Sequence, residues 1–258
     1  MHLLVRHLLQ QRPLVDKHVF WLNTQDPEDR AYMFGLRDAF PDFFEVWEAN
    51  TPHKLAKGAD FNAFNIYPYF ERCVELDTTY IRLDDDIVWM HGNAIFNLLK
   101  CRQENPHPPL IYGTILNNGI INHLLQRFGR ISTEIGTAQY NATGNSWKDP
   151  KWAEWLHEQV LPLIEGNQSY KLQIPNWLIM DHERVSINCI SWEGATFAQF
   201  DGKVGKDEEL WLTSQLPKLL HQPSLICGDA LVSHFAYYPQ RTYLDTTGLL
   251  ARYEALCP

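Results

Sequence analysis

Three consecutive aspartates inside an apolar run constrain this chain more than any other feature. The run Tyr80–Met90 reads YIRLDDDIVWM, so Asp84, Asp85 and Asp86 interrupt a series of β-branched and aromatic residues. Such residues favour strands whereas aspartate disfavours them, so the sequence predicts a core strand that carries the acids at its carboxyl end. Because adjacent carboxylates repel one another, we expect a cation beside them.

The spacing of the acids indicates a metal site. In an extended chain alternate side chains share a face, which places Asp84 and Asp86 together, roughly 6–7 Å apart at Cα, with Asp85 opposed. Hard divalent ions prefer carboxylate oxygens and keep positions open for phosphate, so this geometry suits a hard divalent ion. Two alternatives are a solvated acidic turn at a strand end and the Mg²⁺ site of a phosphatase or nuclease.

Composition and charge narrow the class of protein. The 258 residues are 45% apolar, which is ample for the core of one α/β domain. The net charge of −9 gives no global attraction to nucleic acid or anionic lipid, although a local basic groove is compatible with it.

The cysteines and the hydropathy pattern suggest a cytoplasmic protein. Five widely separated cysteines form no Cys-x-x-Cys pair, which predicts reduced core thiols rather than a disulfide framework or a zinc site. No apolar run approaches the roughly 20 residues of a membrane span. The N-terminal run MHLLVRHLLQQ is interrupted by Arg6 and His7, so it predicts an amphipathic helix rather than a signal peptide.

Hydrophobic periodicity and turn residues predict an alternation of helices and strands. Asp149 and Pro150 have the residue types of a helix cap and a first helical position. Asp181, His182 and Glu183 lack the spacing of His-Glu-x-x-His and are assigned to the surface. The expected strands are 17–23, 43–47, 110–116, 184–192 and 230–237, and the expected helices are 2–11, 62–76, 93–103, 120–128, 150–164 and 210–220.

An apolar strand that ends in Asp-x-Asp resembles the metal-binding motif of nucleotide-sugar-dependent glycosyltransferases with the GT-A fold. The resemblance implies an α/β fold in a single domain, residues 1–258, with a mixed, mostly parallel central sheet flanked by helices. Residues 1–116 would bind nucleotide and metal, and residues 117–258 would bind the acceptor. In such enzymes a first strand holds the nucleobase. Here the chain begins with a helix, so that strand is absent or atypical, through truncation or an unusual nucleotide pocket.

The resemblance also implies roles for residues beyond the acidic run. A C-terminal histidine returns to the metal in similar enzymes, which points to His234 as the third ligand beside Asp84 and Asp86. Asp84 or Asp85 would instead bind the ribose. Asn117 and Asn118, at the end of an expected strand, would lie beside the donor sugar or the acceptor, or form a plain turn.

The diphosphate and the acceptor hydroxyl need further side chains. Arg241 would neutralise the diphosphate through paired hydrogen bonds, as could Lys203 and Lys206. In similar inverting enzymes a carboxylate at a helix start removes the acceptor proton, which points to Glu208 or Asp207, with Glu209 third. Acids in the first turn of a helix can instead simply interact favourably with the helix dipole. The assignment of a catalytic base also loses its support if the enzyme retains the configuration of the sugar.

The implied activity is transfer of a hexosyl or pentosyl group from a nucleotide-diphosphate sugar to an acceptor hydroxyl, with Mn²⁺ or Mg²⁺ as cofactor. The acceptor could be a glycan, a protein, a lipid head group or a hydroxylated base in modified DNA. The competing classes are a metal-dependent phosphoryl-transfer enzyme or nuclease and a non-catalytic nucleotide-sugar binding module.

Overall fold

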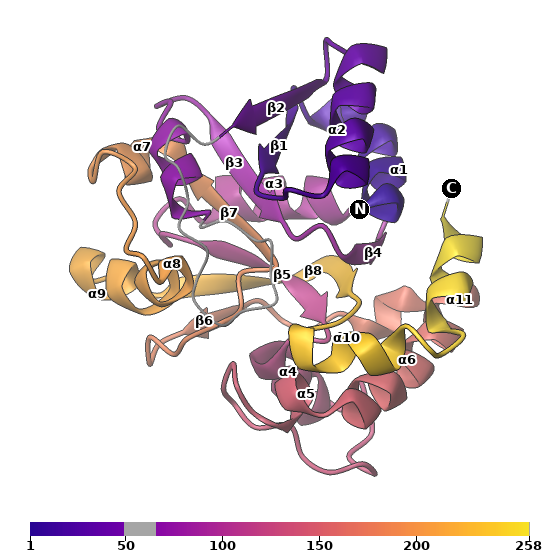
Figure 1. The fold of residues 1–258 in the computed structure, drawn as a ribbon. Coiled ribbons are helices and arrows are strands. Elements are labelled where there is room, and N and C mark those ends of the chain that lie inside the picture. The colour runs from indigo at the N-terminus through magenta and orange to yellow at the C-terminus, as the bar shows by residue number, and fades with distance from the viewer. Residues whose placement is uncertain (49–65, 258) are drawn as a thin grey trace.

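The computed structural model describes residues 1–48 and 66–257 (Figure 1). The α-helices are α1 His2–Gln10, α2 Pro27–Ala39, α3 Ala94–Glu104, α4 Gly119–Arg127, α5 Asn145–Lys148, α6 Pro150–Glu165, α7 Gly194–Ala198, α8 Glu208–Leu210, α9 Leu216–Leu220, α10 Tyr238–Leu244 and α11 Leu249–Leu256. The strands are β1 His18–Leu22, β2 Phe44–Glu48, β3 Thr79–Leu83, β4 Ile87–Met90, β5 Ile111–Leu116, β6 Trp177–Ile179, β7 Cys189–Glu193 and β8 Ser224–His234. Short 3₁₀ helices cover Arg12–Leu14, Tyr67–Arg72 and Ser169–Leu172, and a π-helical turn, Trp211–Gln215, joins α8 to α9.

The central sheet is mixed and mostly antiparallel, which corrects the expectation of a mostly parallel sheet. Within the described residues its strand order is β3-β7-β5-β8-β4, and β6 also pairs with β8. Only the β5–β8 pair is parallel among these pairings. The strand expected to end in the acids is β3, which ends at Leu83; β4, on the other side of the acids, runs in the opposite direction, and β6 and β7 also pair antiparallel with their neighbours.

A separate strand–helix–strand unit precedes this sheet. β1 pairs in parallel with β2, with His18 opposite Phe44, and α2 makes the crossover between them. Asp26 caps α2 by accepting hydrogen bonds from the amides of Glu28 and Asp29. The strands expected over 17–23 and 43–47 are thus confirmed, but in the described residues they form a two-stranded sheet outside the central one. Whether β1 holds a nucleobase stays a prediction.

One buried apolar cluster joins the two expected halves of the chain. It includes Leu4 from α1, Tyr112 from β5, Trp152 from α6 and Tyr253 from α11. In Figure 1, α1, α2 and the two-stranded sheet lie at one end, and α4, α5, α6 and α10 lie together at the other. This continuity agrees with an α/β fold in one domain. All five cysteines are free thiols.

Several local expectations are confirmed and others are wrong. Asp149 caps α6 through the amide of Lys151, with Pro150 in the first turn, as predicted. The helix expected over 62–76 is wrong where it can be compared, because 66–76 contains only a 3₁₀ helix and irregular backbone; Asn62 and Asn65 lie outside the described residues. The strand expected over 184–192 begins only at Cys189, and residues 184–188 are irregular. Across the residues described, no helix is both long and apolar enough to cross a membrane.

Candidate functional site

The acidic turn lies at one edge of the central sheet, where several strands end together. β3 runs parallel to β5, because both pair antiparallel with β7, and β5 runs parallel to β8. The carboxyl ends of β3, β5 and β8 therefore meet at one edge. Asp84 follows β3 there, Asn117 follows β5, and His234 closes β8. The topology thus gathers polar side chains from distant parts of the sequence.

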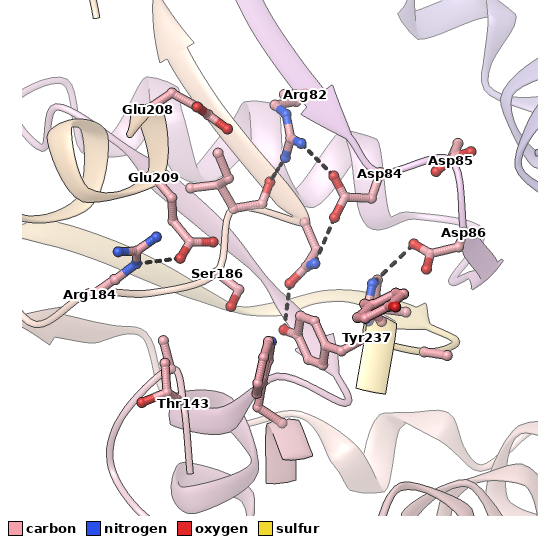
Figure 2. A pocket seen from close by; sticks show the side chains of 17 residues that line it. Arg82, Asp84, Asp85, Asp86, Thr143, Arg184, Ser186, Glu208, Glu209 and Tyr237 are labelled. Atoms are coloured by element: carbon pink, nitrogen blue, oxygen red, sulfur yellow. Dashed lines mark hydrogen bonds and ion pairs between the residues drawn. The ribbon is translucent and has the colours of Figure 1, made fainter. Parts of the chain in front are cut away.

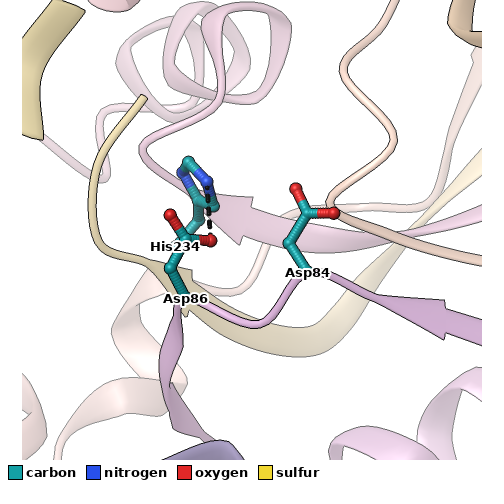
Figure 3. A group of neighbouring side chains, drawn as sticks. All are labelled: Asp84, Asp86 and His234. Atoms are coloured by element: carbon teal, nitrogen blue, oxygen red, sulfur yellow. Dashed lines mark ion pairs between the residues drawn. The ribbon is translucent and has the colours of Figure 1, made fainter. Parts of the chain in front are cut away.

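Asp84, Asp86 and His234 form a compact cluster (Figure 3). One potential ligand atom from each lies within 4.8 Å of the other two, which confirms the predicted proximity of these three residues. The prediction of an extended, alternating backbone through the acids is wrong, because residues 84–86 form the turn between β3 and β4. The turn still directs Asp84 and Asp86 toward a common site and leaves Asp85 exposed.

Asp86 is the centre of an ion-pair network. Its Oδ1 lies 3.0 Å from Nε2 of His234, and its Oδ2 accepts a 2.7 Å hydrogen bond from Nη2 of Arg241. Burial alone would raise the pKa of Asp86, but the charges of His234 and Arg241 outweigh it and hold that pKa below its ordinary value. Burial likewise opposes the charge on His234, and the neighbouring Asp86 outweighs it, so the pKa of His234 is raised. Each of the two side chains thus favours the charged form of the other.

Asp84 has its own set of partners. Nη2 of Arg82 lies 2.6 Å from its Oδ1, and Nδ2 of Asn188 donates a 2.7 Å hydrogen bond to its Oδ2. Arg82 lies in β3 and Asp84 directly follows that strand, so the two side chains are close in the chain as well as in space. Asn188, in the irregular segment before β7, extends the network across the sheet edge.

The three clustered residues fit a divalent ion. Two carboxylates and one imidazole form a donor set suited to Mn²⁺ or Mg²⁺, and three protein ligands leave further positions open. Nδ1 of His234 is buried and has no hydrogen-bond partner, so this ring is not held by a second contact that would fix its proton. A bound ion needs Nε2 without a proton, so its affinity should rise with pH.

A cavity of about 580 Å³ opens beside the cluster (Figure 2). Its lining includes the three aspartates and His234, and it extends to Glu208 and Glu209 at the start of α8 and to Trp147 and Tyr237. The size is that of an ordinary small-molecule site. The cavity therefore connects the candidate metal ligands with the carboxylates that the sequence suggested as bases.

The three acids at the start of α8 are not equivalent. Both oxygens of Asp207 accept 2.9 Å hydrogen bonds from Arg184, and Oδ1 also caps Leu210, so this exposed residue is engaged outside the cavity lining. Glu209 lines the cavity and accepts a 2.6 Å bond from Arg184. Glu208 is half-buried in the cavity wall, and burial raises its pKa. Burial also raises the pKa of Glu209, and Arg184 only partly offsets this effect.

The remaining sequence candidates support the site from outside the cavity. Asn117 is buried with a left-handed φ of 67° and donates to the carbonyl of Phe235 and to Oε1 of Gln240. Asn118 caps α4 and donates to the carbonyl of Ser186. Neither asparagine lines the cavity, so their assignment to sugar binding stays a prediction. Arg241 contacts the site through Asp86, and it too lies outside the lining.

Sequence reasoning missed Arg82, Arg184, Asn188 and Tyr237, all of which line the cavity. Arg82 carried a usable signal, since it lies only two residues before Asp84. Arg184 and Asn188 were assigned to a strand, and their place beside the acids depends on the irregular path of 184–188. The hydroxyl of Tyr237 donates a 2.9 Å bond to Oδ1 of Asn188, a contact that no local pattern indicates.

Comparisons with known proteins leave the family open. Models of protein families, curated proteins and solved structures gave no match to this chain. The geometry of the site therefore carries the functional argument alone.

Proposed function

We propose that this protein is a metal-dependent glycosyltransferase that moves a hexosyl or pentosyl group from a nucleotide-diphosphate sugar to an acceptor hydroxyl with inversion. One observation carries the proposal: a single cavity contains both the cluster of Asp84, Asp86 and His234 and the half-buried carboxylate of Glu208. The first group of residues suits a metal and a diphosphate. The second suits proton removal from an acceptor.

The donor end of the site would form around the cluster. Asp84, Asp86 and His234 would hold Mn²⁺ or Mg²⁺, and when bound the ion supplies positive charge to the departing diphosphate. Arg82 and Arg241 are each paired with one of these aspartates, which places guanidinium donors where the diphosphate would lie. In the alternative arrangement Asp84 or the exposed Asp85 binds the ribose.

The acceptor end would form around α8. Glu208 takes the proton of the acceptor hydroxyl while that oxygen bonds to the anomeric carbon, and the sugar–phosphate bond breaks with its electron pair leaving on the diphosphate. A pKa raised by burial suits this role, because a more basic carboxylate removes the proton more readily. Asp207 was an equal candidate by sequence, but its two oxygens are engaged by Arg184, so Glu208 is the first choice.

A non-catalytic binding module has one observation in its favour. All four carboxylate oxygens of Asp84 and Asp86 already have protein partners, from Arg82, Asn188, His234 and Arg241. In that case the cluster would be a structural ion-pair network, and the protein would bind nucleotide weakly without catalysing a reaction. A phosphoryl-transfer enzyme would use the same acids but would act without a sugar donor.

Calorimetric titration of UDP and of GDP into the purified protein, first with Mn²⁺ and then with EDTA, tests the proposal. We expect one nucleotide to bind with Mn²⁺ and to lose most of its affinity in EDTA and in the Asp86→Asn variant. Asp181→Asn, which changes an exposed acid outside the cavity, is the matched control and should bind like the parent.

The negative outcomes separate the alternatives. If neither EDTA nor the Asp86→Asn substitution changed the nucleotide affinity, the metal site would be contradicted. Folded protein that binds neither nucleotide but hydrolyses p-nitrophenyl phosphate would indicate phosphoryl transfer instead.

A further inference from the structure

The cavity has an aromatic side as well as an acidic one. Trp147 from α5 and the consecutive residues Tyr237 and Tyr238 line it, and the Tyr238 side chain is 65% exposed. The rings of Trp147 and Tyr237 lie 6.2 Å apart with their planes inclined at 45°. Figure 2 shows Glu208 on one side of the cavity and Thr143 and Tyr237 on the other. A molecule in the cavity would therefore meet ring faces opposite a carboxylate.

A buried polar network holds Trp147 and Tyr237, so this part of the aromatic surface is formed before any ligand binds. Nε2 of Gln240 donates a 2.8 Å bond to the carbonyl of Ser146, which precedes Trp147. Oε1 of Gln240 accepts a 3.0 Å bond from the amide of Tyr237, and the Tyr237 hydroxyl is fixed by Asn188. The Gln240 side chain thus ties α5 to the start of α10, and a preorganised surface loses less entropy on binding.

The charge of the lining disfavours an anionic acceptor. Five acids line the cavity, whereas its arginines are Arg82 and Arg184. Arg82 is paired with Asp84, and Arg184 with Asp207 and Glu209. His234, the remaining basic group of the lining, is paired with Asp86. Beside Glu208 and Glu209, away from the cluster where a metal would offset the charge of the diphosphate, DNA, an anionic phospholipid or a sialylated glycan would meet carboxylates, which repel like-charged ligands.

We infer that the acceptor of this site is an uncharged carbohydrate. Its ring stacks on Trp147 and Tyr238, because the C–H-rich face of a sugar is apolar and its rim is polar, which matches an aromatic surface beside carboxylates. The stacked ring presents a hydroxyl to Glu208. This inference rests on the proposed function and narrows its acceptor from the four chemical classes that the sequence left open.

The test is binding to a glycan array that carries neutral, sialylated and sulfated glycans, with Mn²⁺ and UDP present, followed by titration of the best-bound glycan. We expect binding confined to neutral glycans. Trp147→Ala and Tyr238→Ala should each weaken it by about tenfold, the upper range for an aromatic contact. The control is Tyr170→Ala, which removes an equally exposed tyrosine (59%) outside the cavity and should bind like the parent.

The exposed Tyr238 keeps the test valid if Trp147→Ala fails to fold. Binding confined to anionic glycans or to a single-stranded oligonucleotide would overturn the inference, and so would an absence of glycan binding in protein that binds UDP with Mn²⁺. If the parent protein itself showed no Mn²⁺-dependent nucleotide binding, the result would instead contradict the proposed function. Neutral glycan binding that Trp147→Ala and Tyr238→Ala leave unchanged would place the acceptor elsewhere.

Discussion

His157, in the middle of α6, makes the stability of this protein depend on pH. The side chain is fully buried, and its Nε2 lies 2.8 Å from the carbonyl oxygen of Phe235, which can only accept. Nε2 therefore carries the proton, and Nδ1 accepts a 2.8 Å bond from the Tyr253 hydroxyl, which also bonds Ser233. A neutral imidazole matches this network, because Nε2 then donates and Nδ1 accepts.

Burial lowers the pKa of His157 from 6.5 to about 4. Between those values the unfolded chain binds more protons at this position than the folded protein does. The free energy of unfolding therefore falls as the pH decreases from 6.5 to 4, and the contribution is fully present above pH 6.5. A difference of 2.5 units at 1.36 kcal/mol per unit gives about 3 kcal/mol from this one side chain.

The assay is urea unfolding of the parent and of His157→Gln at several pH values from 7 to 4. Glutamine can donate to Phe235 and accept from Tyr253 but does not titrate, so the variant should lose about 3 kcal/mol less stability than the parent over this interval. The control is His107→Gln, at an exposed site, which should lose as much unfolding free energy over this interval as the parent does. If the free energy of unfolding fell equally with pH in the parent and in His157→Gln, the reasoning would be refuted.

Three further predictions concern the site and its support. Asp86→Asn should lower glycosyl transfer by about 100-fold, as expected for loss of a main electrostatic stabiliser, while circular dichroism shows a folded protein. Glu208→Gln should lower turnover by roughly 10²–10⁴-fold whereas the exposed Glu183→Gln should not; equal rates for both variants would remove Glu208 as the base. Gly228→Ala would place a Cβ 1.8 Å from a backbone carbonyl oxygen and should destabilise the protein by about 3 kcal/mol in urea unfolding, whereas Gly92→Ala, which has open space around it, should change little.

Much of the local structure could be predicted because its causes are local. Asp149 and Pro150 are side chains whose own chemistry starts a helix, and α6 begins where they indicate. The apolar run before Asn117 predicts β5 within one residue. The helix expected over 62–76 fails from residue 66 onward, because Pro68 and the aromatic residues around it adopt a 3₁₀ helix that packs Phe70 against Trp192.

The candidate site could be predicted only in part. The cluster of Asp84, Asp86 and His234 was expected, and its geometry is present. The separation of Asp207 from Glu208 was not, because Arg184 approaches the start of α8 from another part of the chain and pairs with Asp207 and Glu209. Adjacent acids are equivalent in a sequence, and only a tertiary partner distinguishes them.

The sequence by itself determined where most strands and helices lie, and it marked the acidic turn as a place that needs a cation. Those properties depend on backbone preferences and on repulsion between adjacent carboxylates, which act over a few residues. The tertiary structure alone decided that the central sheet is mostly antiparallel, because strand pairing joins distant segments whose direction no local pattern encodes. It likewise decided that Trp147 faces the same cavity as Glu208, since a contact that holds α5 beside α10 comes from Gln240, far along the chain.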